Sequence, residues 1–216
     1  MHYTHLFFDL DGTLTESGPG ITNCVKYALE KFGIDERDEG NLKRFIGPPL
    51  VDSFMEFYGF SESDAREAMR LYRERFGTVG IFENSVYEGI PETLAKLKDS
   101  GKKLYVATSK PEIYVPRILE HFDLSKYFED AEGSDIEETR SNKALVIKYV
   151  IEKNGLEEEA KANKIVMIGD RKHDIIGAKK NSLESIGCLW GYGSRKELSE
   201  HGATTIIEKV EDLLEV

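Results

Sequence analysis

The chain has 216 residues, 40% of them hydrophobic and 32% charged, which suits one globular domain with a sizeable insertion or two small domains. With 29 Lys and Arg against 40 Asp and Glu the net charge is −11, which argues against nucleic acid or an anionic membrane as the main partner, although a few local cations could still bind a small phosphorylated substrate. The two cysteines lie far apart and outside any metal-ligand pattern, no apolar run reaches the ~18 residues of a membrane span, and the N-terminus does not resemble a signal peptide, so we expect a cytoplasmic protein.

The first predicted strand covers residues 4–8 and ends in a pair of carboxylates. Asp9 and Asp11 follow this apolar run directly, and side chains two residues apart on a strand point to the same side. Two like charges held so close cost stability unless a cation or a shared proton relieves them, which indicates a functional site. A helix cap or turn is the alternative. An EF-hand loop is excluded, because the acid it needs at its twelfth position is Gly20 here.

Between residues 20 and 84 the sequence shows only helical patterns. The first pattern places six apolar side chains on one helical face: Ile21, Cys24, Val25, Ala28, Leu29 and Phe32. Three more helices are predicted over residues 41–46, 51–58 and 61–77, the last with a capping signal at Ser61. We therefore expect a helical cap domain at residues 17–84, inserted into an α/β core made of residues 1–16 and 85–216. The two points where the chain leaves the core and returns to it are close together and would form a hinge, so such an insertion could work as a lid.

After the insertion, short apolar runs alternate with amphipathic segments. The apolar runs predict strands at residues 104–107, 165–168 and 185–190, a weaker one near 204–207 and an edge strand near 128–133. The amphipathic segments predict helices at residues 91–99, 111–121 and 142–153. This alternation predicts a doubly wound, Rossmann-like α/β fold, with a parallel sheet covered on both faces. Functional residues of such sheets gather at the carboxyl ends of the strands.

Four groups of polar residues accompany the predicted strands. They are residues 9–14, Thr108-Ser109-Lys110 after the strand at 104–107, Lys143 at the start of a predicted helix, and residues 169–174 after the strand at 165–168. In a parallel sheet all four groups meet at one end. Carboxylates with open positions suit magnesium, which prefers oxygen ligands, and the hydroxyl and ammonium groups beside them suit a phosphoryl group.

Each group has a simpler interpretation when it is taken alone. Thr108 or Ser109 could cap the helix that follows. Lys143 could be a solvated surface lysine. Asp170 and Asp174 could cap a helix. The order and spacing of all four groups together favour a shared site.

Three further features carry less information. His173 is expected to be exposed and receives no catalytic role. Gly191-Tyr192-Gly193 could suggest a phosphate loop, but a plain turn is favoured because no GxGxxG or P-loop lysine pattern follows. The acidic run at residues 135–138, just ahead of Lys143, adds negative charge near the site or forms a solvated loop.

In this order, the motifs resemble those of the haloacid dehalogenase superfamily of phosphohydrolases, and within it the phosphoglycolate phosphatase-like branch. The resemblance covers essentially the whole chain. It rests on residues 7–14, 106–110, 143 and 169–174, with support from residues 45–50 and 190–193. Ser182 departs from the branch, which often has Gly after Asn181, and this departure puts only the geometry of that turn in doubt.

The resemblance implies catalytic roles. Asp9 would be the nucleophile and form an aspartyl-phosphate, which splits one difficult displacement into two. Asp11 would first protonate the leaving oxygen as general acid and then activate water as general base. Thr108 would hydrogen-bond the transferring phosphoryl oxygens, and Lys143 would neutralise their charge and steady Asp9.

The resemblance also implies ligand-binding residues. Mg²⁺ would be held by the Asp9 carboxylate, the Asp11 backbone carbonyl and Asp170, with Asp174 in the outer shell. Substrate-binding residues are expected at six positions: Gly12, Thr13, Arg44, Gly47, Ser109 and Lys110. The alternative for Arg44 is a solvated helix face that it shares with Lys43.

The second aspartate also discriminates among the reactions of the superfamily. Its dehalogenases lack Asp at the position of Asp11, and its transport ATPases have Thr there. Its phosphonatases carry a cap lysine poised for a Schiff base, and none of Lys26, Lys31 and Lys43 lies in such a setting. The resemblance therefore implies a magnesium-dependent phosphatase, monomeric or homodimeric, that acts on a small phosphorylated metabolite such as phosphoglycolate, a nucleoside monophosphate, a sugar phosphate or pyrophosphate. A phosphomutase or phosphotransferase with the same aspartyl-phosphate, and a non-enzymatic regulator, remain alternatives.

Overall fold

The computed structural model describes residues 3–135, 140 and 142–216. The chain divides into two compact units, one formed by Met1–Thr15 with Val86–Val216 and the other by Glu16–Ser85. The two short segments that lead from one unit to the other, β2 (Thr15–Glu16) and β3 (Ser85–Val86), pair with each other as a two-stranded sheet. No helix in the described part of the chain is both long enough and apolar enough to span a membrane.

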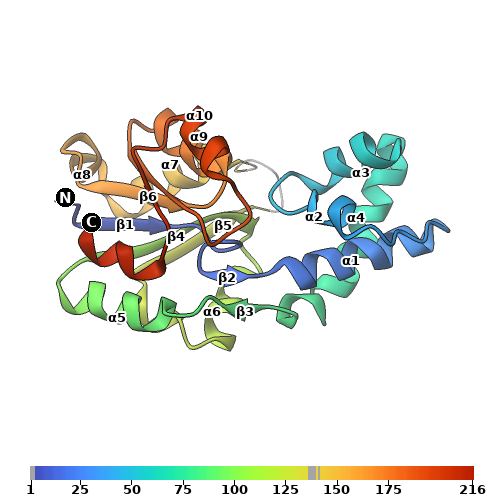
Figure 1. Ribbon diagram of the computed structural model, residues 1–216, viewed down its shortest axis with the longest axis horizontal. Coiled ribbons are helices and arrows are strands. Elements are labelled where there is room, and N and C mark those ends of the chain that lie inside the picture. The colour runs from blue at the N-terminus through green and yellow to red at the C-terminus, as the bar shows by residue number, and fades with distance from the viewer. Residues whose placement is uncertain (1–2, 136–139, 141) are drawn as a thin grey trace. The chain divides into compact units, whose positions relative to one another are not determined.

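The first unit is built on a six-stranded parallel sheet with the strand order β5-β4-β1-β6-β7-β8. In chain order its strands are β1 (His5–Phe8), β4 (Lys103–Pro111), β5 (Asp130–Ser134), β6 (Ile165–Gly169), β7 (Glu184–Cys188) and β8 (Thr205–Ile207). Phe8 at the end of β1 lies level with Val106 and Ile168 of the neighbouring strands, so the residues that follow these three emerge at the same edge of the sheet (Figure 1). The prediction of a doubly wound α/β fold is confirmed.

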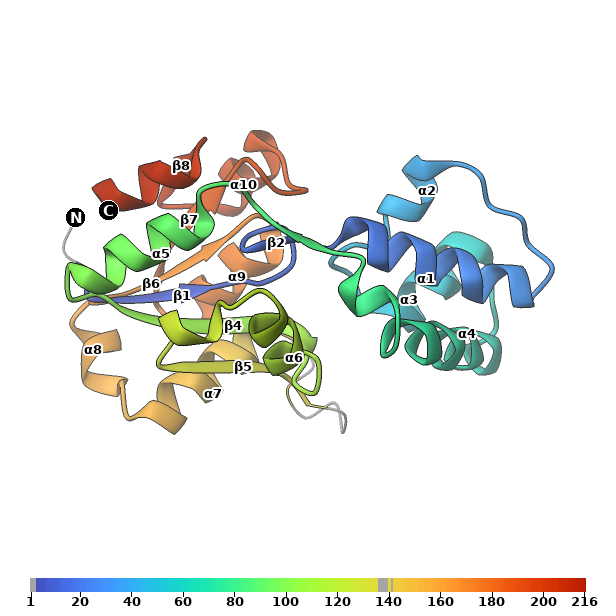
Figure 2. The same cartoon turned by 90° about the horizontal axis from the view of Figure 1, so that it is seen from below.

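Helices cover both faces of this sheet. On one face α7 (Lys143–Asn154) packs against β4 and β5, and α9 (Lys172–Lys180) packs against β6 and β7, with α10 (Arg195–His201) beside α9. On the other face lie α5 (Ile90–Asp99), α6 (Val115–His121) and η3 (Val210–Glu215), with η2 (Ser125–Tyr127) against α5 and α6 (Figures 1 and 2). The short α8 (Glu157–Lys161) follows α7. Helix α9 was not predicted from the apolar pattern, because its nine residues hold only two large apolar side chains, Ile175 and Ile176.

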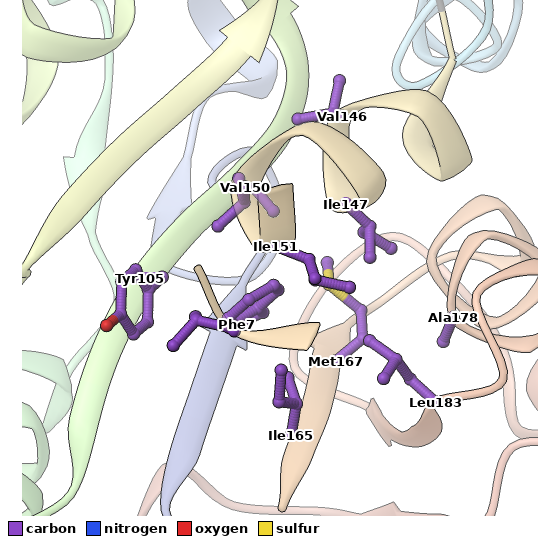
Figure 3. Close-up of a cluster of buried hydrophobic side chains, with 12 residues drawn as sticks. Phe7, Tyr105, Val146, Ile147, Val150, Ile151, Ile165, Met167, Ala178 and Leu183 are labelled. Atoms are coloured by element: carbon purple, nitrogen blue, oxygen red, sulfur yellow. The ribbon is translucent and has the colours of Figure 1, made fainter. Parts of the chain in front are cut away.

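The core between the sheet and α7 fixes the direction of the first strand's side chains. Phe7 of β1 and Met167 of β6 pack against Ile147 and Val150 of α7 in a buried cluster of twelve residues (Figure 3). Side chains alternate along a strand, so the residue two positions after Phe7 faces the same helices. That residue is Asp9, which the apolar packing of β1 therefore directs toward α7 and α9.

The second unit is helical. Its elements are α1 (Gly18–Lys31), α2 (Glu39–Lys43), α3 (Leu50–Tyr58), α4 (Glu62–Phe76) and η1 (Gly80–Phe82). The predicted start of the last long helix is confirmed, because the Ser61 hydroxyl accepts a hydrogen bond from the Asp64 amide at 3.2 Å. Aromatic side chains cluster in this unit, where the buried Phe45 ring lies tilted against Phe54 and Tyr58 and edge-on to Phe57.

Candidate active site

Asp9 and Lys143 form the centre of a buried polar cluster at the carboxyl edge of the sheet. Oδ1 of Asp9 accepts a hydrogen bond from the Leu10 amide at 2.7 Å and lies 2.6 Å from Nζ of Lys143. Lys143, at the first turn of α7, is only 4% exposed; its Nζ also donates to the Ala107 carbonyl at 2.9 Å and lies 2.9 Å from Oδ1 of Asp174. The alternative of a solvated surface lysine is therefore wrong.

Three carboxylates converge beside this lysine. Asp9, Asp170 and Asp174 are all buried, and each offers one oxygen within 4.8 Å of the others. Among the described residues Lys143 is the only cation that pairs with any of them, and it contacts two of the three. The cluster therefore holds more negative than positive charge. A set of carboxylate oxygens with excess negative charge has the donor chemistry of a site for a hard divalent cation such as magnesium.

The pKa values of these acids reflect the same excess of negative charge. Burial raises the pKa of Asp9 to about 6, against the lowering effect of Lys143 and with a further increase from the charge of Asp174. Burial and the charges of Asp174 and Asp9 raise the pKa of Asp170 to about 8, although the Tyr192 amide opposes this shift. Burial lowers the pKa of Lys143, but the carboxylates of Asp174 and Asp9 outweigh it and leave that pKa raised. Without a bound cation, the cluster therefore holds protons near neutral pH.

The end of β4 supplies a second lysine and the hydroxyls. Nζ of Lys110 contacts both carboxylate oxygens of Asp11, at 2.9 and 3.0 Å, and Lys110 is itself buried. The buried Thr108 hydroxyl accepts from the Lys110 amide at 3.2 Å and hydrogen-bonds the Asp9 carboxylate. Ser109 is half-buried between them, and its carbonyl accepts from the Ser134 hydroxyl. The alternative that Thr108 or Ser109 caps a helix is wrong, because both lie inside β4 and α6 begins later.

The turn after Asp9 requires glycine at one position. Gly12 has φ +85°, and a Cβ there would overlap the Asp170 carboxylate. The neighbouring Thr13 hydroxyl donates to Oδ1 of Asp170 at 3.3 Å. The structure therefore places Gly12 and Thr13 against the carboxylate cluster, and their expected contact with substrate stays a prediction.

Two of the expected substrate-binding residues belong to the second unit. The exposed Arg44 follows α2, and its guanidinium carbon lies 3.7 Å from the centroid of the Phe57 ring. Gly47 is exposed and has φ +107°, in the region that favours glycine. The role of both residues in substrate recognition stays a prediction.

Several features around the cluster differ from the expectations or add to them. His173 was expected to be exposed, but it is half-buried on the first turn of α9, where burial and the nearby cations lower its pKa. Asp174 does cap that helix as well as face Lys143, since its Oδ2 accepts from the Arg171 amide at 3.1 Å. Ser182 adopts φ +57°, a left-handed conformation that explains why glycine suits this turn. Residues 136–138 of the acidic run lie outside the described residues.

The contribution of the segment after β7 was not predicted from the sequence. The Trp190 indole donates to the Thr13 carbonyl at 3.0 Å, and the Tyr192 amide donates to Oδ2 of Asp170 at 2.7 Å. The glycines on either side of Tyr192 were the available signal, because paired glycines indicate a close approach of backbone to another group.

Comparison with known proteins adds independent findings. A family model described as haloacid dehalogenase-like hydrolase matches residues 6–188. A 5′-nucleotidase of Pseudomonas aeruginosa is 45% identical, over 94% of this chain and 90% of that protein. The tyrosine-protein kinase PtkA of Mycobacterium tuberculosis is 34% identical over 94% of this chain and 67% of its own length. A phosphoglycolate phosphatase of Vibrio parahaemolyticus is 28% identical over 97% of this chain and 93% of its own length. The crystal structure of a predicted phosphatase from Clostridium acetobutylicum is 46% identical, covers 100% of both chains and has a TM-score of 0.92.

Proposed function

Because this chain belongs to the haloacid dehalogenase-like hydrolase family and is a phosphatase of that family, we propose that it hydrolyses a small phosphomonoester with Mg²⁺ and through an aspartyl-phosphate on Asp9. The observation that carries this proposal is the buried cluster at the carboxyl edge of the sheet, in which Asp9 and Asp174 pair with Lys143 and each offers an oxygen within 4.8 Å of one from Asp170. Ligand sites of open α/β sheets lie at this edge.

Asp9 is the proposed nucleophile. Its Oδ1 is fixed by the Leu10 amide and by Lys143, so the carboxylate is held in one orientation before substrate arrives. A carboxylate oxygen forms a bond to phosphorus while the bond from phosphorus to the ester oxygen breaks. Water then attacks the phosphorus of the aspartyl-phosphate, which releases inorganic phosphate and restores the carboxylate.

Asp11 is the proposed proton carrier. It gives a proton to the leaving ester oxygen in the first step and takes one from the attacking water in the second. Its carboxylate is 20% exposed, in contrast to the buried cluster, and Lys110 holds both of its oxygens. This exposure lets Asp11 exchange protons with a substrate group or a water molecule.

The phosphoryl oxygens need donors and positive charge. The Thr108 hydroxyl and the Lys143 ammonium already contact Asp9, so a phosphoryl group bonded to Asp9 would lie within reach of both. The Asp9 carboxylate, the Asp11 backbone carbonyl and Asp170 would hold Mg²⁺, with Asp174 in its outer shell. The cation, when bound, supplies positive charge that lessens the repulsion between an anionic nucleophile and an anionic phosphate.

The substrate class is inferred from the relatives rather than from the geometry of the site. The identity to a 5′-nucleotidase, 45%, exceeds the 28% identity to a phosphoglycolate phosphatase, which favours a nucleoside monophosphate as the substrate. We assign substrate selection to the helical unit as a cap domain, with Arg44 and Gly47 as its contact residues. Fold alone does not determine the substrate.

A phosphotransferase is the second candidate. It is favoured by the relative named tyrosine-protein kinase PtkA, at 34% identity. Such an enzyme would pass the phosphoryl group from Asp9 to an acceptor hydroxyl instead of to water. Phospho-enzyme that persists after quenching, with little phosphate release, would support this second candidate.

The test is phosphate release from a panel of nucleoside 5′-monophosphates, phosphoglycolate and sugar phosphates, with Mg²⁺ and with chelator. Asp9→Asn should lower turnover by roughly 10³-fold or more because it removes the nucleophilic oxygen charge. Asp99→Asn is the matched control, because Asp99 is an exposed residue at the end of α5 and should leave turnover unchanged. Substantial turnover by Asp9→Asn, or full activity in chelator, would contradict the proposal.

A further inference from the structure

The loop between β7 and α10 contacts two separate parts of the candidate active site. From this loop the Trp190 indole N–H donates to the Thr13 carbonyl at 3.0 Å. Two residues later the Tyr192 amide donates to Oδ2 of Asp170 at 2.7 Å. One short segment therefore binds both the turn after the first strand and one of the three clustered carboxylates.

Glycine lets this loop approach so closely. A Cβ on Gly191 would overlap the Gly12 carbonyl and crowd the Asp170 side chain, and a Cβ on Gly193 would overlap the Asp170 carbonyl. Such contacts with backbone cannot be relieved by rotation of a side chain. The loop is therefore packed directly against the backbone of both Gly12 and Asp170. This packing can fix the distance between the turn after the first strand and Asp170.

Asp170 depends on this support more than the other two acids do. Asp9 and Asp174 each lie within 3 Å of the Lys143 ammonium, whereas no ion pair involves Asp170 in the part of the chain that the structure describes. The hydrogen bonds to its carboxylate come from the Tyr192 amide at 2.7 Å and from the Thr13 hydroxyl at 3.3 Å. Thr13 is in turn held by Trp190, so both donors are positioned by the same loop.

We propose that Trp190 is a positioning residue for cation binding: its indole N–H, together with the Tyr192 amide, holds the turn at residues 12–13 and the Asp170 carboxylate at the separation that a divalent cation requires. This inference rests on the proposed function, because it takes Asp170 as a metal ligand. Groups that orient metal ligands typically change metal affinity by about 10- to 100-fold when removed. Trp190 acts through the turn and through one neutral hydrogen bond, so the expected loss is smaller, about 5- to 10-fold.

The experiment is a calorimetric titration of the full-length protein with MgCl₂, without substrate. Trp190→Phe keeps an aromatic side chain but removes the N–H donor together with part of the ring system, and it should bind Mg²⁺ about 5- to 10-fold more weakly than the wild type. Tyr127→Phe is the matched control, because it also removes a polar hydrogen from an aromatic side chain but lies in η2, outside the candidate site, and its affinity should match the wild type. Unfolding of all three proteins is also followed in chelator, because a purely structural role would lower the stability of Trp190→Phe and leave its Mg²⁺ affinity unchanged.

Equal Mg²⁺ affinities for the wild type and Trp190→Phe would overturn this inference and leave the proposed function intact. A wild type that binds no Mg²⁺ would overturn both. If Trp190→Phe unfolds too readily to titrate, Thr13→Val replaces it, because valine keeps the shape of the side chain and removes the hydroxyl through which the turn held by Trp190 contacts Asp170. Weaker Mg²⁺ binding by that variant supports the inference, and unchanged binding overturns it.

Discussion

Removal of the Lys143 charge is the most direct test of the electrostatic account of the site. Lys143→Met keeps most of the side chain's length and deletes the ammonium that lies 2.6 Å from Asp9 and 2.9 Å from Asp174. Lys143 is 4% exposed and Asp174 is 1% exposed, so water cannot replace the lost partner. Loss of one partner from a buried ion pair typically costs about 3–5 kcal/mol. We expect that cost at pH 8 in chelator, where Asp9 is ionised.

The same reasoning predicts a pH dependence with a definite sign. The pKa of Lys143 is raised, so the lysine stays charged throughout the range from pH 5 to 8, and the change must come from the carboxylates. The pKa of Asp9 is about 6 with the lysine present, and its removal raises that pKa further. At pH 5 the variant's native state therefore binds protons that neutralise the cluster, and the destabilisation should be smaller there than at pH 8.

The assay is urea unfolding of the wild type and Lys143→Met in chelator at pH 5 and pH 8. Lys148→Met, on the same helix, is the matched control; its ion pair with Glu152 is 3.6 Å long, both side chains are more than half exposed, and its loss should cost less than about 1 kcal/mol at either pH. A destabilisation by Lys143→Met that is equal at pH 5 and pH 8 would refute the account, because it would show that protons do not replace the ammonium.

Three further outcomes are expected. In chelator, the wild type should lose stability as the pH rises from about 4 to about 8, because the pKa values of Asp9, about 6, and Asp170, about 8, make the native state bind more protons than the unfolded state over that range. Urea unfolding with Mg²⁺ should show a weaker dependence, and a flat profile in chelator would contradict this. Gly12→Ala should destabilise the protein by about 1–3 kcal/mol more than Gly33→Ala, because both have positive φ but only Gly12 faces a carboxylate; equal melting temperatures would contradict the packing argument. Arg44→Ala should lower kcat/KM for the preferred substrate more than for an aryl phosphate, and equal losses would remove Arg44 from substrate recognition.

The sequence could predict the sheet and the meeting of its motifs because both depend on local patterns. Short apolar runs alternating with amphipathic segments indicated the central strands, and parallel pairing then required Asp9, Thr108 and Asp170 to emerge at one edge. The strand that carries Thr108 and Ser109 was harder to delimit. It extends to Pro111 because Pro111 pairs with Ser134 of β5 beyond an irregularity in the register after Ala107, and pairing with another strand leaves no local signal in the sequence.

Burial of charged groups could not be predicted in the same way. Lys110 and Lys143 are both less than 10% exposed, and each owes its burial to a carboxylate supplied by another segment, Asp11 for one and Asp9 with Asp174 for the other. A lysine side chain in the sequence carries no mark of such a partner. The contact of Trp190 with the Thr13 carbonyl was missed for the same reason, because the acceptor is a backbone atom 177 residues away.

The net charge of −11 does not oppose binding of an anionic substrate at this site. Interactions between exposed charges are largely screened beyond about 8–10 Å at physiological ionic strength, whereas buried charges a few ångströms apart are screened much less. Lys143 lies within the cluster and Lys110 pairs with the neighbouring Asp11, and a divalent cation held by the cluster would add two more positive charges. The local balance therefore decides phosphate affinity, and we expect it to depend more on Mg²⁺ concentration than on added monovalent salt.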